Sequence, residues 1–290
     1  MITELRFYLH NITISEMKDH YQYNYLSKWI DHLQSTGIYS FTLDELKCAF
    51  PQSTDFSLRN ALFRLVEKSR IVSVFKGFYV IIPVEYLSTG MVTPTRFMDS
   101  LMKSLGRKYY FALLSAAMIH GAAHQQPQTW FIITELPNMR PIQKKNMKIA
   151  FITKSAISHI AVNRIKSEVG YIEVSNPVLT ATDLIQFENR AGGLNRVIAI
   201  LDELSEFITL SQITSEFLEQ VSASVIQRLG YIWEFLLGRK EHADLLWNQC
   251  RDRQMVFYRT PLKNGQSMKE RTETNRWKII KNIATDENEF

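Results

Sequence analysis

The sequence predicts an α+β fold in two parts, and three observations lead to this prediction. The 290 residues suffice for about two domains of ordinary size. The first part, of about ninety residues, has helical spacing of apolar residues followed by one hairpin pattern. In the remainder, strand-like and helix-like segments are mixed, as in α+β domains. We therefore expect one domain over residues 1–88 and a second over residues 89–290.

The N-terminal part begins with helical spacing over residues 23–36, and Gly37 follows at the position of a helix-ending glycine. Thr42 is expected to cap a second helix, because Glu45 stands three residues later and completes a capping box. Pro51 is expected to end this second helix. The apolar positions of the two helices are Tyr25, Leu26, Trp29, Ile30, Leu33, Leu43, Leu46 and Phe50.

A third, amphipathic helix is predicted to start at Ser53-Thr54 after a tight turn. A β-hairpin is predicted next, with strands Ile71–Phe75 and Phe78–Ile82 joined by Lys76-Gly77 and ended by Pro83. The predicted buried positions of the third helix are Phe56, Ala61, Leu62, Leu65 and Val66. Its predicted polar positions are Ser57, Arg59, Asn60, Arg64, Glu67 and Lys68.

The order of two helices, a turn, a third helix and a two-stranded wing predicts a winged helix-turn-helix. Such a module places its recognition helix in the major groove of DNA. Thr54 and the helix N-terminus are expected to hold one phosphate, and Lys76 another. The expected DNA-contacting residues are Ser53, Thr54, Ser57, Arg59, Asn60, Arg64, Lys68 and Lys76.

Two features leave alternatives open for this module. Residues 1–82 carry nine Lys and Arg against eight Asp and Glu, so the module alone is expected to bind DNA weakly. Winged helices also serve as protein-contact modules. The alternative hypothesis is therefore a protein-interaction module without DNA binding.

The second part is expected to contain both helices and strands. One nearly all-apolar, buried helix is predicted over Tyr109–Gly121. Asp183 is expected in the first turn of a helix capped by Thr180, where the helix dipole favours it. Further helices are predicted over residues 94–105, 194–207 and 222–237, and strands over residues 129–134, 147–153 and 171–174.

Charge is unevenly distributed in this part. Residues 90–175 carry eleven basic against four acidic residues, residues 176–250 five against ten, and residues 251–281 nine against three. Such asymmetry favours an anionic partner for the basic segments, with solvated surface as the alternative. The basic residues singled out are Arg140, Lys144, Lys145, Lys148, Arg251, Arg253, Arg259, Lys263, Lys269 and Arg271.

The sequence argues against several classes of protein. There is no apolar run of about 18 residues and no signal-like N-terminus, so we expect a cytoplasmic protein without a membrane partner. Cys48 and Cys250 lack metal or disulfide spacing, and both are expected to be buried. His120 and His124 lack a third ligand, and Gly121 interrupts the helix between them, which favours packing over metal binding.

No catalytic constellation is evident either. A nuclease site needs a carboxylate pair with a nearby lysine, and the best strand has none two residues after Glu173. A nucleotidyltransferase needs an Asp-x-Asp pair for magnesium, and the sequence contains none. Gly192-Gly193 lacks the lysine and serine of a phosphate-binding loop. We expect no enzyme activity, no cofactor and no metal.

Several segments together resemble a known family. They are Leu114–Gln125, Gly77-Phe-Tyr79 with Pro83, Pro177–Leu184, Gly192–Asn195, Gln227–Tyr231 and Arg276-Trp277. In this order they are similar to the AbiEi antitoxins, the repressor–antitoxin components of type IV abortive-infection toxin–antitoxin systems. The resemblance covers roughly residues 40 to 280 and includes no motif from the first forty.

The resemblance implies two tasks in phage defence. The winged helix would bind inverted repeats of double-stranded DNA in its own promoter and repress transcription. The C-terminal domain would neutralise a toxin that resembles nucleotidyltransferases. The family is not known for catalysis of its own, in agreement with the missing catalytic residues.

Overall fold

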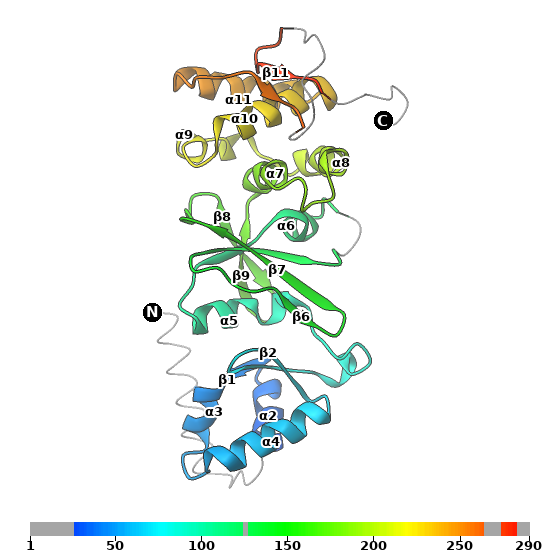
Figure 1. The fold of residues 1–290 in the computed structure, drawn as a ribbon, viewed down its shortest axis with the longest axis vertical. Helices are drawn as coiled ribbons and strands as arrows, with labels where there is room; N and C mark the ends of the chain where they lie inside the picture. Colours follow the sequence, from blue (N-terminus) through cyan, green and yellow to red (C-terminus); the bar gives the residue numbers. More distant parts are fainter. Residues whose placement is uncertain (1–25, 124–126, 264–273, 283–290) are drawn as a thin grey trace. The chain divides into compact units, whose positions relative to one another are not determined.

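The computed structural model describes residues 26–123, 127–263 and 274–282 (Figure 1). It divides into two compact units. Unit 1 extends to residue 107 and includes residues 141–149 and 166–171, and unit 2 holds the rest. Helices and sheets occur together, which confirms the predicted α+β class. A domain boundary after residue 88 stays a prediction.

Unit 1 contains the three helices and the hairpin expected from the sequence, although residues 23–25 lie outside the described residues. Strands β1, β3 and β2 form an antiparallel sheet in that order. The elements are α2 (Leu26–Ser35), β1 (Ser40–Thr42), α3 (Leu43–Ala49), α4 (Asp55–Glu67), β2 (Ile71–Phe75), β3 (Phe78–Ile81), the 3-10 turns η1 (Val84–Tyr86) and η2 (Pro94–Arg96), and α5 (Met98–Ser104).

Local capping interactions explain where these helices begin and end. Thr42 Oγ1 accepts a hydrogen bond from Glu45 N at 3.0 Å, and Thr42 N donates to Glu45 Oε2 at 2.7 Å, which confirms the capping box. Gly37 has a φ of +79°, and Ile38 N donates to Leu33 O at 2.9 Å, so α2 ends as predicted.

The hairpin is tied to the helices through its turn and its core. Gly77 has a φ of +72°, which the turn requires, and its carbonyl accepts from Leu43 N at 2.8 Å. Trp29 and Phe41 pack edge to face in the core, with ring centroids 5.0 Å apart. The first contact places the wing turn beside α3, whereas the second packs α2 against β1, the strand that pairs with β3.

A six-stranded sheet has the strand order β6-β7-β5-β4-β9-β8. Strand β4 pairs antiparallel with β5 and parallel with β9. The β6–β7 and β8–β9 turns belong to unit 1. This region contains β4 (Tyr109–Phe111), α6 (Leu113–Ile119), β5 (Trp130–Glu135), β6 (Ile142–Lys144), β7 (Met147–Lys154), β8 (Val162–Ser167) and β9 (Gly170–Ser175).

The C-terminal half of unit 2 is mainly helical. Helix α7 contacts α6, α8 and α10 and is buried from Pro177 to Ile185, so it is central to the unit. None of the described helices combines the length and apolar character needed to cross a membrane. The elements are α7 (Pro177–Gln186), α8 (Leu194–Ser205), the 3-10 turn η3 (Leu210–Gln212), α9 (Ser215–Leu218), α10 (Ala223–Tyr231), the π-helical η4 (Ile232–Leu236), α11 (Lys240–Asp252), β10 (Thr260–Pro261) and β11 (Ile279–Ile280).

The structure corrects three expectations. Residues 109–121 form a strand and then a helix, because Tyr109–Phe111 pair with β5 and β9 in the sheet, and Leu113, the first residue of α6, has a φ of +50°. Helix α7 begins at Pro177 with Asn176 as its cap, so Thr180 lies inside the helix. Cys48 is exposed, on the side of α3 away from the core, whereas Cys250 is buried as expected.

Candidate functional site

Helix α4 has one buried face and one broad exposed face. Leu58, Leu62 and Leu65 recur at helical spacing and pack into the core of unit 1. The opposite side is left to solvent. All the residues expected to contact DNA are exposed: Ser53, Thr54, Ser57, Arg59, Asn60, Arg64, Lys68 and Lys76.

The burial predicted for two residues of this helix was wrong. Phe56 and Val66 were expected in the core, yet they are 75% and 38% exposed. Leu58, which the prediction omitted, is buried instead. Helix geometry explains this difference. Leu58, Leu62 and Leu65 are spaced so that they share one face of the helix, and Phe56 lies on the opposite face.

The N-terminus of α4 has features of an anion site. Thr54 is the N-cap, and its Oγ1 accepts from Ser57 N at 3.2 Å, so the hydroxyl hydrogen remains available to donate. Asp55 is the one acidic residue in this first turn, and Lys47 Nζ lies 3.0 Å from its carboxylate. The ion pair offsets the charge that would otherwise repel a phosphate.

The hairpin turn presents Lys76 to solvent between β2 and β3. Burial raises the pKa of Tyr79 in β3, and the positive charge of Arg59 opposes that rise. Arg59 of α4 therefore acts electrostatically on the wing strand. The exposed cations of α4 and the exposed Lys76 of the wing turn both belong to unit 1.

The remaining basic residues are less uniform. Arg253 pairs with Glu219 at 2.8 Å, so its charge is partly compensated. Lys269 and Arg271 lie outside the described residues. The other four basic residues of this part lie on the β6–β7 hairpin or just before it, and all are exposed: Arg140, Lys144, Lys145 and Lys148.

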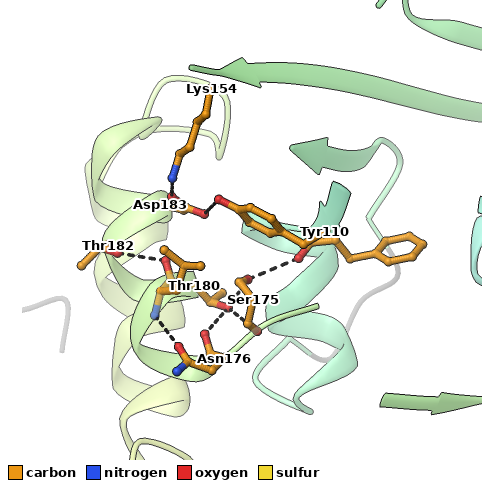
Figure 2. A network of polar contacts seen from close by, with 9 residues as sticks. Tyr110, Lys154, Ser175, Asn176, Thr180, Thr182 and Asp183 are labelled. Carbon is orange, nitrogen blue, oxygen red and sulfur yellow. Dashed lines mark hydrogen bonds and ion pairs between the residues drawn. The ribbon is translucent and has the colours of Figure 1, made fainter. Parts of the chain in front are cut away.

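A buried polar network lies at the centre of unit 2 (Figure 2). Asp183 is 1% exposed and accepts from Lys154 Nζ at 2.6 Å and from Tyr110 OH at 2.9 Å. Burial raises the pKa of Asp183, while Lys154 and Tyr110 oppose the rise. These three side chains satisfy one another and join β4, β7 and α7. Asp183 therefore has a positioning role in mid-helix, rather than the helix-dipole role expected in a first turn.

A second set of hydrogen bonds holds the start of α7 against β9 (Figure 2). Asn176 Oδ1 accepts from Leu179 N at 2.8 Å, and the hydroxyls of Ser175 and Thr180 are 2.7 Å apart. His120 Nε2 donates to Ser175 O at 2.6 Å, and burial lowers the pKa of this histidine. His120 therefore packs against the network, as expected, whereas His124 lies outside the described residues.

Two segments singled out in the sequence contact each other near the C-terminus. Gln227 Nε2 donates to Trp277 O at 2.6 Å, and Gly230 faces the Trp277 ring so closely that a Cβ there would clash. Arg228 forms a buried ion pair with Glu188. Gln227 and Gly230 thus hold Trp277 against α10, and Arg228 joins α10 to the segment after α7.

No local pattern in the sequence indicates the roles of Lys154 and Tyr110, because Asp183, to which both donate a hydrogen bond, is distant in the chain. The buried polar residues of unit 2 described above therefore hold its strands and helices together. In the part of the chain that the structure describes, no three His, Cys, Asp or Glu side chains gather in a way that could hold a metal.

Comparison with known proteins finds a family for the middle part of the chain. Residues 110–235 match the family model of the AbiEi antitoxin C-terminal domain. This part of the chain belongs to that domain family, which confirms the resemblance and implies a toxin partner. The match contains the Tyr110–Lys154–Asp183 network and the Gln227–Tyr231 segment.

A solved structure has a similar fold. The crystal structure of the RV2827C protein from Mycobacterium tuberculosis matches with a TM-score of 0.62 at 16% identity, over 87% of this chain and 89% of that chain. At this identity, the similarity concerns the fold alone. No curated protein matches this chain.

Proposed function

We propose that this chain is a DNA-binding autorepressor and antitoxin that acts by binding and not by catalysis. Unit 1 would bind inverted repeats in the promoter of its own operon. The C-terminal domain would neutralise a toxin that resembles nucleotidyltransferases. The observation that carries the DNA-binding half is that all eight residues expected to contact DNA, on and around α4 and at the wing turn, are exposed.

The arrangement of unit 1 supports its interpretation as a winged helix-turn-helix. Helices α3 and α4 are joined by a short turn, and β2 and β3 follow as a hairpin whose turn exposes Lys76. In such modules the second helix enters the major groove. We therefore assign α4 as the recognition helix and the β2–β3 hairpin as the wing.

The exposed residues of unit 1 would make two kinds of contact with DNA, to the bases and to the phosphate backbone. Arg59, Asn60 and Arg64 would contact base edges and the groove walls. Thr54 with the first turn of α4 would hold one phosphate, and Lys76 another. Ser53, Ser57 and Lys68 would add contacts to the backbone.

The antitoxin half rests on the family of residues 110–235. An antitoxin needs a surface that recognises its toxin, and it needs no reacting groups. The polar network and the ion pair buried in unit 2 fit this role, because their groups are partnered within the protein.

A gel-shift assay with the DNA directly upstream of the chain's own reading frame tests the first half. We expect a shift with this DNA and a much weaker one with a scrambled duplex of equal length. Failure to shift the upstream DNA, with retained binding to the toxin, would favour a protein-interaction module instead.

Co-expression with the product of the adjacent reading frame tests the second half. We expect that product to arrest growth alone and the full chain to restore growth. A chain carrying Arg59→Ala and Arg64→Ala should still restore growth, because these residues belong to the DNA-binding half. Absence of rescue by the wild-type chain would contradict the antitoxin proposal.

A further inference from the structure

The exposed side of α4 carries an aromatic stripe. Phe56 is 75% exposed and Phe63 is 65% exposed. With Asn60 between them, they follow the i, i+4, i+7 spacing of a single helix face. This face lies opposite the buried Leu58, Leu62 and Leu65. The two rings therefore point away from the core of unit 1.

Cations flank this stripe on both sides. Arg59 lies about 60° around the helix from the Phe56 direction on one side, and Arg64 about 80° on the other, at the usual 100° per residue. Lys68 adds a third exposed cation at the end of α4. Glu67, which is exposed, continues the stripe four residues after Phe63, so this side of the helix combines two rings, three cations and one carboxylate. Its net positive charge and its apolar rings are complementary to a groove with negative walls and an apolar feature on its floor.

The same charges disfavour a second copy of this chain as the partner. Self-association through this face would bring Arg59, Arg64 and Lys68 of one copy against the same three cations of another, with Glu67 as the acidic residue in the stripe, and a net contact of like charges is unfavourable. The major groove of DNA has phosphate walls and exposes the C5-methyl groups of thymine on its floor. Phenylalanine is one of the residues that contact this methyl group.

We infer that Phe56 and Phe63 determine DNA specificity by packing on thymine methyl groups in the major groove. This inference rests on the proposed DNA-binding function. Seven helical residues span about 10 Å, which matches about three base-pair steps of about 3.4 Å each. The preferred half-site therefore has two thymines about three base pairs apart, with Asn60 placed to pair with an adenine between them.

The test compares two duplexes of the region directly upstream of the chain's own reading frame. One has the natural bases, and the other has deoxyuridine in place of every thymidine, which removes only the methyl groups. The full wild-type chain should bind the uracil duplex more weakly, by about fourfold for each contacted methyl group. This comparison needs no substituted protein.

Variants then assign the effect to the two rings. Phe56→Ala and Phe63→Ala should each bind the thymine duplex about fourfold more weakly and discriminate less. The double variant should bind both duplexes equally. Val84→Ala is the matched control, since Val84 is as exposed as Phe56 but lies outside α4, and it should discriminate like the wild type.

The outcomes separate the two proposals. If neither duplex is bound, the proposed DNA-binding function fails and the inference fails with it. If the wild type binds both duplexes equally, or the double variant still discriminates, the inference is overturned while DNA binding stands. Loss of an oligomer in the double variant, without any methyl effect, would instead assign the stripe to contact between copies.

Discussion

Lys154 Nζ lies 2.6 Å from Oδ1 of Asp183 and connects strand β7 to the buried helix α7. The carboxylate is almost completely buried, whereas Lys154 is 23% exposed at its side chain. Such a pair adds little net stability relative to apolar residues, but removal of one partner leaves an uncompensated charge. The antitoxin domain should therefore be sensitive to the loss of Lys154.

We predict that Lys154→Met lowers the free energy of unfolding by about 3 kcal/mol. Lys148→Met is the control, because Lys148 is exposed on the same strand and should change stability by less than about 0.5 kcal/mol. Urea unfolding followed by circular dichroism measures both. Equal stability of the two variants would contradict a supporting role for the Lys154–Asp183 pair.

The stability that Lys154→Met loses should depend on pH. Burial raises the pKa of Asp183 above its value in the unfolded chain, and without Lys154 less opposes that rise. The folded state then binds a proton that the unfolded chain has released, so stability is highest below the unfolded pKa and falls as pH rises towards the folded pKa. Lys154→Met should lose more stability at about pH 8 than at about pH 5, and a loss independent of pH would contradict this.

Tyr110→Phe removes only the hydroxyl that donates to Asp183 Oδ2 at 2.9 Å. Because the acceptor is a buried carboxylate, we expect a loss of about 2 kcal/mol in the free energy of unfolding. Tyr258→Phe serves as the control, since Tyr258 is 74% exposed. If the two variants unfolded at the same temperature, the hydrogen bond from Tyr110 to Asp183 would not contribute to stability.

Gly230→Ala reverses the usual preference for alanine in a helix. Alanine normally stabilises a helix by about 1 kcal/mol relative to glycine. Here its Cβ would overlap the buried ring of Trp277, so we expect a net destabilisation of about 2 kcal/mol. In a double-mutant cycle with Trp277→Phe, the two losses should be less than additive. If the two losses of stability were additive, the destabilisation by Gly230→Ala would not arise from overlap with the Trp277 ring.

Local signals in the sequence were sufficient for the helices and hairpin of unit 1. The Thr42–Glu45 capping box and Gly37 act within four residues of the helix ends that they define. The burial of Phe56 was predicted wrongly, because residue type was weighed above spacing. The spacing of Leu58, Leu62 and Leu65 would have placed Phe56 on the exposed side.

Unit 2 was harder to predict for physical reasons. Residues 109–121 are apolar almost throughout, so periodicity cannot separate a buried strand from a buried helix. The edge strand β8 is mostly polar and has no apolar alternation to reveal it. The Lys154–Asp183 pair joins residues 29 positions apart, which only the packed sheet and helix bring together. Asn176-Pro177, by contrast, was a usable signal for the start of α7.

The central claim is that the exposed side of α4 binds DNA, and a salt titration of Arg64→Ala tests it most directly. Affinity of the full chain for its own upstream DNA is measured over a series of salt concentrations, with Lys240→Ala as a control in the other unit. Arg64→Ala should bind more weakly, and the slope of log affinity against log salt should fall by about one for each bound copy. An affinity and slope equal to those of the wild type would contradict the claim.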